Sequence, residues 1–145
     1  MIPIRENVIS AEKRIRPYIR RTPLEPSFHL SAVKGCDAYL KLENLQYTGS
    51  FKTRGAMNKL LSLTPDERKK GIVTASTGNH GLAVAHGLTR LGMNGIIYLP
   101  ENTSPQKIEL LKHYEVALRF HGNDCDAAES IARKEAAKKD RCYIS

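Results

Sequence analysis

The sequence predicts an α/β fold with an open parallel sheet and flanking helices. From about residue 71 onward, short apolar runs alternate with longer segments that have helical periodicity. Each run is too short for a helix and apolar at successive positions, which is typical of a strand buried on both faces. Strands that alternate with helices of this length form βαβ units, in which the strands are parallel.

The first seventy residues predict a less regular arrangement. Apolar and charged residues recur at helical spacing near the start, and a proline-rich stretch follows. A short segment then alternates like a strand, and Ser50 is a suitable N-cap for the next helix. The predicted order is a helix over 8–20, a connector over 20–28, a strand over 37–43, a helix over 51–63 and a helical turn over 64–71.

The second half supplies the regular units. The first predicted helix of this half is apolar on most sides, which favours a position between two layers. Asp124 is a suitable N-cap for the last predicted helix. Strands are predicted over 72–75, 95–100, 116–121 and from 142, with helices over 78–92, 104–114 and 126–139. A parallel strand needs a crossover and neighbours, so a strand over the last residues predicts an incomplete chain.

Composition and charge exclude several classes of protein. Hydrophobic residues make up 41% and charged residues 26% of the 145 residues, a globular profile without a signal-peptide core or an apolar run of membrane-spanning length. We therefore expect a cytoplasmic protein. The three cysteines lack metal-like spacing and are expected to be free thiols. The net charge is +8, but no aromatic residues interleave the basic ones, so no nucleic-acid partner is expected.

A lysine stands just inside a predicted helix start, in YTGSFKTRGAMNKL (47–60). Lys52 follows a tight loop and lies at the edge of the apolar side of the helix. A helix start and partial burial both disfavour an ammonium, and a neutral amine can attack a carbonyl. Most lysines are simply solvated, and Lys59 points nearly the same way. The helix geometry alone is therefore compatible with both readings.

The second notable stretch is ASTGNHG (75–81), which follows a strand and opens a helix. Ligands of open α/β sheets bind at this carboxyl end of the strands, and the N–H groups there form an anion nest. Ser76, Thr77 and Asn79 add side-chain donors. The spacing matches neither a dinucleotide fingerprint nor a P-loop. His80 and His86 are six residues apart, which does not fit a zinc site, so no metal is predicted.

Together, LKLENLQYTGSFKTRGAMNKL and VTASTGNHGLAVA resemble the serine/threonine dehydratase family of pyridoxal-phosphate enzymes. RTPL (21–24) and LPENTSPQKIELLKHY (99–114) extend the likeness, which runs from about residue 15 to the end. The resemblance implies a fold of type II, like that of the tryptophan synthase β chain. It also implies two lobes with the cofactor between them: residues 1–70 would begin the larger lobe and residues 71–145 would form the smaller one. A small amino acid as substrate and a homo-oligomer at full length are further implications.

The resemblance also implies roles for individual residues. Lys52 matches the lysine that holds pyridoxal phosphate covalently and later moves the Cα proton, and Phe51 matches the aromatic residue beside it. Asn79 matches the asparagine that meets the ring oxygen of the cofactor. Ser76, Thr77, Asn79 and His80 match the loop that receives the α-carboxylate of the substrate.

Two departures keep alternatives open. The glycine-rich phosphate cup of the family is not found in these residues, and Thr77 replaces the serine of serine racemases or the alanine of many threonine dehydratases. The first reading is an ammonia-lyase acting on serine, threonine or a related β-hydroxy amino acid. The second is a β-replacement enzyme of the cysteine synthase type, and the third is a non-catalytic truncated product.

Overall fold

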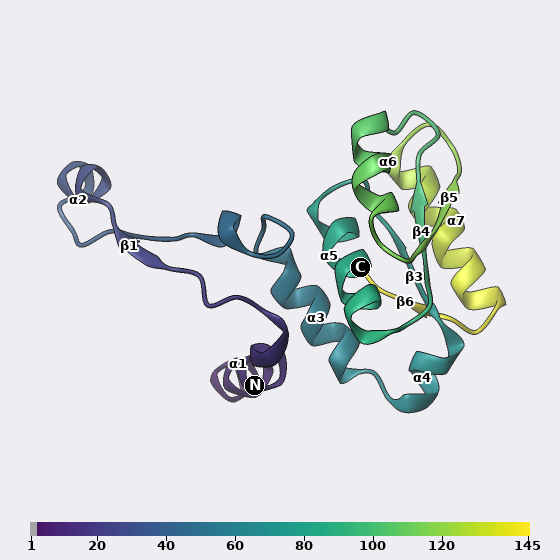
Figure 1. Ribbon diagram of the computed structural model, residues 1–145, viewed down its shortest axis with the longest axis horizontal. Helices are drawn as coiled ribbons and strands as arrows, with labels where there is room; N and C mark the ends of the chain where they lie inside the picture. Colours follow the sequence, from purple (N-terminus) through teal and green to yellow (C-terminus); the bar gives the residue numbers. More distant parts are fainter. Residues whose placement is uncertain (1–2) are drawn as a thin grey trace.

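A four-stranded parallel sheet forms the centre of the computed structural model, which describes residues 3–145 (Figure 1). The strand order is β5-β4-β3-β6, so consecutive βαβ units add strands first on one side of β3 and then on the other. This confirms the predicted α/β class. The strands are β3 (Ile72–Ala75), β4 (Gly95–Leu99), β5 (Ala117–Phe120) and β6 (Cys142–Tyr143).

Helices cover both faces of this sheet because successive strand residues point to opposite sides. Val73, Ile96 and Tyr98 face α7, whereas Ile97 and Leu99 face α5 and α6. The helix α5 also packs against α3 on its outer side, which confirms its predicted position between two layers. The bounds are α3 (Lys52–Ser62), α5 (Asn79–Leu91), α6 (Pro105–Lys112) and α7 (Cys125–Lys138), and Asp124 caps α7 through a hydrogen bond from the Ala127 N–H.

The N-terminal helix differs from its prediction at both ends. It begins at Ile4 as α1 (Ile4–Ile15) and continues as the 3₁₀ turn η1 (Arg16–Tyr18). The α-helix ends early because Pro17 has no N–H for a helical hydrogen bond and its ring clashes with the preceding turn. Ile15 and Ile19 then pack on Met57 of α3, which attaches this segment to the body.

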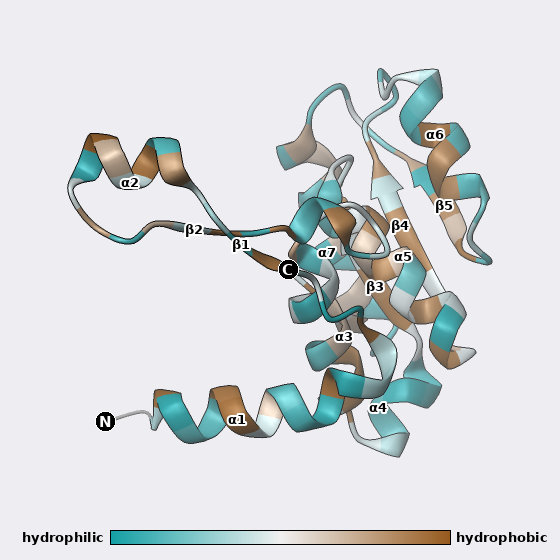
Figure 2. Ribbon diagram, turned by 60° about the vertical axis from the view of Figure 1, so that its left-hand side comes forward, coloured by the Kyte–Doolittle hydropathy of each residue, from teal (hydrophilic) through white to brown (hydrophobic). Residues whose placement is uncertain are grey.

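A projecting arm replaces the predicted connector. β1 (Leu24–Pro26) pairs antiparallel with β2 (Tyr39–Lys41), and α2 (Phe28–Lys34) joins them at the tip (Figure 1). The predicted proline-rich connector contains β1, which the sequence did not reveal because three residues that follow one proline and end on another show no alternation. The strand predicted over 37–43 is confirmed by β2. Figure 2 shows apolar residues along this arm. The exposed ones are Leu24, Phe28, Leu30, Val33, Tyr39 and Leu40.

The remaining elements are short. η2 (Glu43–Leu45) precedes the loop that leads into α3, and α4 (Pro65–Lys70) starts with a capping box between Thr64 and Glu67. Among residues 3–145, no helix combines the length and apolarity needed to cross a membrane, and all three cysteines are free.

Candidate active site

Two predicted segments meet at the carboxyl edge of the sheet. One is the start of α3, which carries Lys52, and the other is the loop from Ser76 to Gly78 between β3 and α5. α3 and α5 pack side by side, which brings their N-terminal ends to the same side of the molecule (Figure 1). Lys52 is close enough to His80 for its positive charge to help lower the pKa of that imidazole.

A tight turn presents Lys52. Gly49 adopts φ 69°, in the left-handed region that favours glycine. The N-cap of α3 is Phe51, so the prediction of Ser50 as the N-cap was wrong by one residue. The buried Ser50 accepts a hydrogen bond from the Lys52 N–H through its Oγ, at 3.2 Å. The Thr53 hydroxyl donates to the Ser50 carbonyl at 3.2 Å. These bonds fix the first turn of α3.

The side chain of Lys52 is exposed, so the predicted partial burial is wrong. Thr53, Ala56, Met57 and Leu60 form the buried side of α3, and Lys52, at the first position of the helix, lies outside it. The Lys52 Nζ lies 5.8 Å from the ring centroid of Phe51, which is itself 63% exposed. An amine and an aromatic face therefore stand together, open to solvent, on the side where His80 lies.

The opposite loop folds back closely on the start of α5. A Cβ on Gly81 would lie 2.3 Å from the Ser76 carbonyl oxygen, so only glycine permits this approach. The Ser76 Oγ accepts a hydrogen bond from the Gly78 N–H at 3.2 Å. No side chain of the described residues caps the start of α5, whose exposed first residue is Asn79. The first N–H groups of the helix are consequently available to an anion.

His80 is held by a network that the sequence did not reveal. The Thr74 hydroxyl donates to the Ile144 carbonyl at 2.7 Å and lies 3.2 Å from the His80 Nε2. Since the only hydroxyl proton of Thr74 is used, Nε2 must carry the proton and donate to Thr74, which leaves Nδ1 as an acceptor. Burial lowers the pKa of His80, and the charge of Lys52 lowers it further. His80 is therefore a neutral, oriented imidazole.

The Thr77 side chain points to the start of α7. Its hydroxyl is 3.9 Å from the Cys125 Sγ at the start of α7. The loop thus places Ser76, Asn79 and His80 at the α5 end, while the Thr77 hydroxyl is turned toward α7.

A second network missed by the sequence supports α3. Arg54 donates to both carboxylate oxygens of Glu43, at 2.7 and 2.8 Å, and the Thr22 hydroxyl donates to the same carboxylate at 2.6 Å. The hydrogen bond from Arg54 lowers the pKa of Glu43. The pairing joins residues far apart along the chain. The sequence did contain a signal for the role of Thr74, because Thr74 is the one polar residue in the buried run IVTA.

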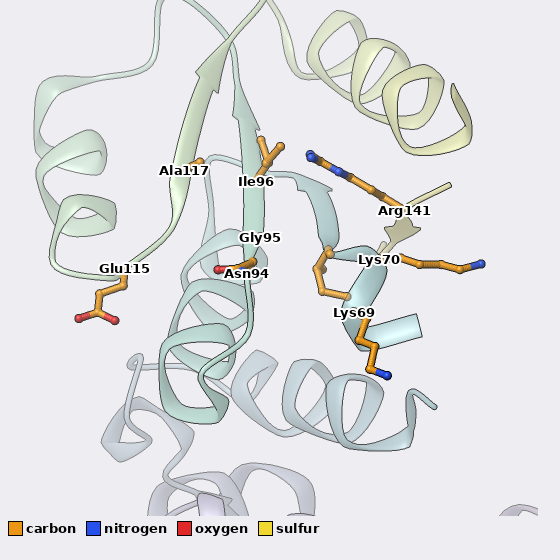
Figure 3. A pocket seen from close by; sticks show the side chains of 10 residues that line it. Lys69, Lys70, Asn94, Gly95, Ile96, Glu115, Ala117 and Arg141 are labelled. Atoms are coloured by element: carbon orange, nitrogen blue, oxygen red, sulfur yellow. The ribbon is translucent and has the colours of Figure 1, made fainter. Parts of the chain in front are cut away.

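A cavity also lies at the other edge of the sheet. It holds about 410 Å³ at the amino ends of β3, β4 and β5, and Lys69, Lys70 and Arg141 line its rim (Figure 3). Lys70 is 2.7 Å from Asp140, and Arg141 is 3.3 Å from Glu135. The carboxyl end of α4 also points at this cavity, which disfavours anions. Its cations are engaged, so this cavity is not the candidate site. Nowhere in residues 3–145 do three His, Cys, Asp or Glu side chains gather as metal ligands would.

Comparisons with known proteins agree with this geometry. Residues 15–145 match the family described as pyridoxal-phosphate dependent enzyme. The chain is 37% identical over 134 residues to an L-threonine ammonia-lyase of Geobacter sulfurreducens, covering 92% of this chain and 33% of that protein. It is 38% identical over 139 residues to a catabolic L-threonine dehydratase of Staphylococcus aureus, covering 95% of this chain and 40% of that protein.

Solved structures show the same fold. Maize serine racemase superposes with a TM-score of 0.87 at 31% identity, covering 97% of this chain and 43% of that one. A processed threonine deaminase from Solanum lycopersicum gives 0.87 at 30% identity, covering 98% and 42%. The fold is therefore that of the type II pyridoxal-phosphate enzymes, and the chain spans 33–40% of the length of the two curated relatives named above. The chain belongs to the family of pyridoxal-phosphate-dependent enzymes.

Proposed function

We propose that this chain carries the reactive lysine and the carboxylate loop of an ammonia-lyase that converts a β-hydroxy amino acid to a 2-oxo acid and ammonia. The observation that carries the proposal is the exposed amine of Lys52, whose charge acts on the neutral His80 in the uncapped first turn of α5. The curated relatives named above, an L-threonine ammonia-lyase and an L-threonine dehydratase, support this reaction class.

The residues at this edge fit pyridoxal phosphate. Lys52 offers an accessible amine for covalent attachment, Phe51 an exposed ring for one side of a planar group, and Asn79 an exposed amide for its ring oxygen. When bound, the cofactor makes the Cα proton of the substrate acidic by accepting the charge that its loss leaves behind.

The chain's own residues then divide the remaining work. The first N–H groups of α5, together with the Ser76 and Asn79 side chains, bind the α-carboxylate of the substrate. This anchoring aims the Cα–H bond at Lys52, an orientation effect that catalysis needs. The amine of Lys52 takes the Cα proton, and His80 accepts a hydrogen bond at Nδ1 without adding charge.

The reaction balances without an oxidant. The Cα proton and the β-hydroxyl leave the substrate as water, and a double bond forms between Cα and Cβ. Water then replaces the amino group, so the products are a 2-oxo acid and ammonia. The Thr77 hydroxyl is turned toward the Cys125 Sγ, and this favours elimination over racemisation.

The proposal extends to the organisation of the protein. Residues 1–70 belong to the larger lobe and residues 71–145 form the smaller one, with the cofactor between them. The functional form is a homo-oligomer that acts on a small amino acid in the cytoplasm, without nucleic acid or membrane. Free thiols at all three cysteines of the described chain support a reducing compartment.

The direct test is product analysis. The full-length gene product is supplied separately with L-serine, L-threonine and hydroxyaspartate, and 2-oxo acid, ammonia and D-amino acid are measured. We expect equal amounts of 2-oxo acid and ammonia, little D-amino acid, and no product with Lys52→Ala. Lys59→Ala, which changes a lysine on the same helix, is the matched control and retains turnover.

The second candidate is β-replacement of the cysteine synthase type. Formation of cysteine from sulfide and an O-acylated serine, with no 2-oxo acid from any hydroxy amino acid, would assign the protein to that class instead. The sequences SFKTRGA and STGNHG favour the ammonia-lyase.

A further inference from the structure

A column of stacked side chains connects the two halves of the candidate site. The His86 ring lies flat on the Tyr47 ring, with centroids 5.2 Å apart and an interplanar angle of 23°. The Arg20 guanidinium covers the Tyr47 ring, 4.5 Å from its centroid. Tyr114 meets His86 edge-on at 6.1 Å and 85°. The stacked and the edge-on arrangements are favourable for aromatic pairs, and the position of Arg20 is favourable for a cation over a ring.

The column bridges the segments that carry the reactive groups. Tyr47 stands five residues before Lys52 in the same loop, and His86 is on α5, seven residues after Asn79. Seven residues along an α-helix return to nearly the same side, so His86 faces the direction that Asn79 faces. The stack therefore joins the loop that presents Lys52 to the helix whose start forms the carboxylate loop.

Each end of the column is firmly held. The buried Gln46 side chain bonds both the N–H and the carbonyl of Arg20, at 2.9 and 3.0 Å, which fixes the strand of chain behind Tyr47. On the other side, α5 is packed between the sheet and α3. Because both segments are held in place, the contact between Tyr47 and His86 fixes the position of the Lys52 loop relative to α5.

The chemistry of His86 fits the use of its ring as a flat contact surface. Its Nε2 is buried and lacks a hydrogen-bond partner among the described residues. Burial, and to a smaller extent the charge of Arg90, lowers the pKa of His86. The other charged and titratable groups around it are Arg20, beyond Tyr47, and the phenols of Tyr47 and Tyr114. A protonated His86 would place a second positive charge on the Tyr47 ring, opposite the Arg20 guanidinium. His86 therefore stacks on Tyr47 as a neutral imidazole.

We propose that His86 is a positioning residue, whose stack on Tyr47 holds the Asn79 end of α5 in register with Lys52. The functional meaning of this alignment rests on the proposed function. The contact itself is measured without cofactor or turnover, so a failure of the stack and a failure of the reaction are separate results.

The test is amide hydrogen exchange on the 145-residue chain. His86→Ala removes the ring, whereas His86→Phe keeps a flat aromatic surface. We expect His86→Ala to speed exchange about five-fold at both 48–52 and 77–81, the scale of one lost aromatic pair, and His86→Phe to restore wild-type rates. Unchanged exchange at both loops in His86→Ala would overturn the proposal. An equal increase across β3 and β4 would also overturn it, because that result describes a general loss of stability.

A second measurement follows the imidazole by NMR. Burial lowers the pKa of His86, so removal of the ring that covers it should raise that pKa. We expect Tyr47→Ala to raise it and Tyr47→Phe to leave it unchanged. Tyr39→Ala, which removes an exposed tyrosine from the arm, is the matched control. Equal titration of His86 in wild type and Tyr47→Ala would contradict the stack.

Discussion

At the scale of the single residue, one hydroxyl orients the imidazole of the candidate site. Thr74 accepts from the His80 Nε2 and donates to the Ile144 carbonyl. Thr74→Val removes both bonds and leaves buried polar groups unpaired, so we expect it to lower the free energy of unfolding by about 2 kcal/mol. Thr74→Ser keeps the hydroxyl and is the control. Denaturant unfolding measures both, and an equal loss in the two variants would show that the methyl group matters and not the hydroxyl.

The ion pair beneath α3 gives a pH-dependent prediction at the same scale. The pKa of Glu43 is lowered in the folded protein, chiefly by its hydrogen bond from Arg54. A carboxyl with a lowered pKa in the folded state stabilises the fold at pH values above its pKa in the unfolded chain, which is about 4.3. This stability is lost as the pH falls through the pKa of the folded state. We expect Glu43→Gln to reduce the free energy of unfolding by about 1–2 kcal/mol near neutral pH.

This difference between wild type and Glu43→Gln should close as the pH falls from about 5 to about 3. Unfolding curves across that range measure it. Glu109→Gln breaks a pair with Lys112 that is exposed to solvent, and it serves as the control with little effect. A gap that persists unchanged in acid would assign the loss to packing instead of charge.

At the scale of the element, the start of α5 depends on its contact with the preceding loop. A Cβ on Gly81 meets the Ser76 carbonyl, whereas a Cβ on Gly55 of α3 meets nothing within 4 Å. We expect Gly81→Ala to destabilise the protein by about 2 kcal/mol and to displace the loop. Gly55→Ala should stabilise it by up to about 1 kcal/mol through helix propensity. Thermal unfolding compares the two, and a stabilising Gly81→Ala would contradict the close approach.

At the scale of the whole molecule, the arm leaves apolar side chains in water. Phe28 is 84% and Val33 62% exposed, on a two-stranded arm of a kind that is marginal alone. We expect the 145-residue chain to self-associate as its concentration rises and to bind pyridoxal phosphate weakly, since it spans 33–40% of the two curated relatives' length. Sedimentation and a cofactor titration test this. A monomer at all concentrations with stoichiometric binding would contradict it.

The sequence predicts the repeating parts of this molecule better than its local contacts. The strands over 72–75 and 95–99 and the start of α3 follow from apolar runs and turn residues, which are local signals. In the arm, β2 follows from the alternation over 37–43, but β1 did not follow, because its three residues are defined as a strand by their pairing with β2. The exposure of Lys52 and the bonds of His80 also depend on residues distant in sequence, which periodicity does not report.

The central claim is that Lys52 is the lysine that binds the cofactor, and reductive trapping tests it most directly. The chain is mixed with limiting pyridoxal phosphate, reduced with borohydride and digested, and the labelled peptides are mapped. Trapping is irreversible, so it identifies the reacting lysine even where binding is weak. We expect the label to concentrate on Lys52 and to disperse in Lys52→Arg. A label spread evenly over the lysines of the wild-type chain, or concentrated on Lys59, would contradict the account.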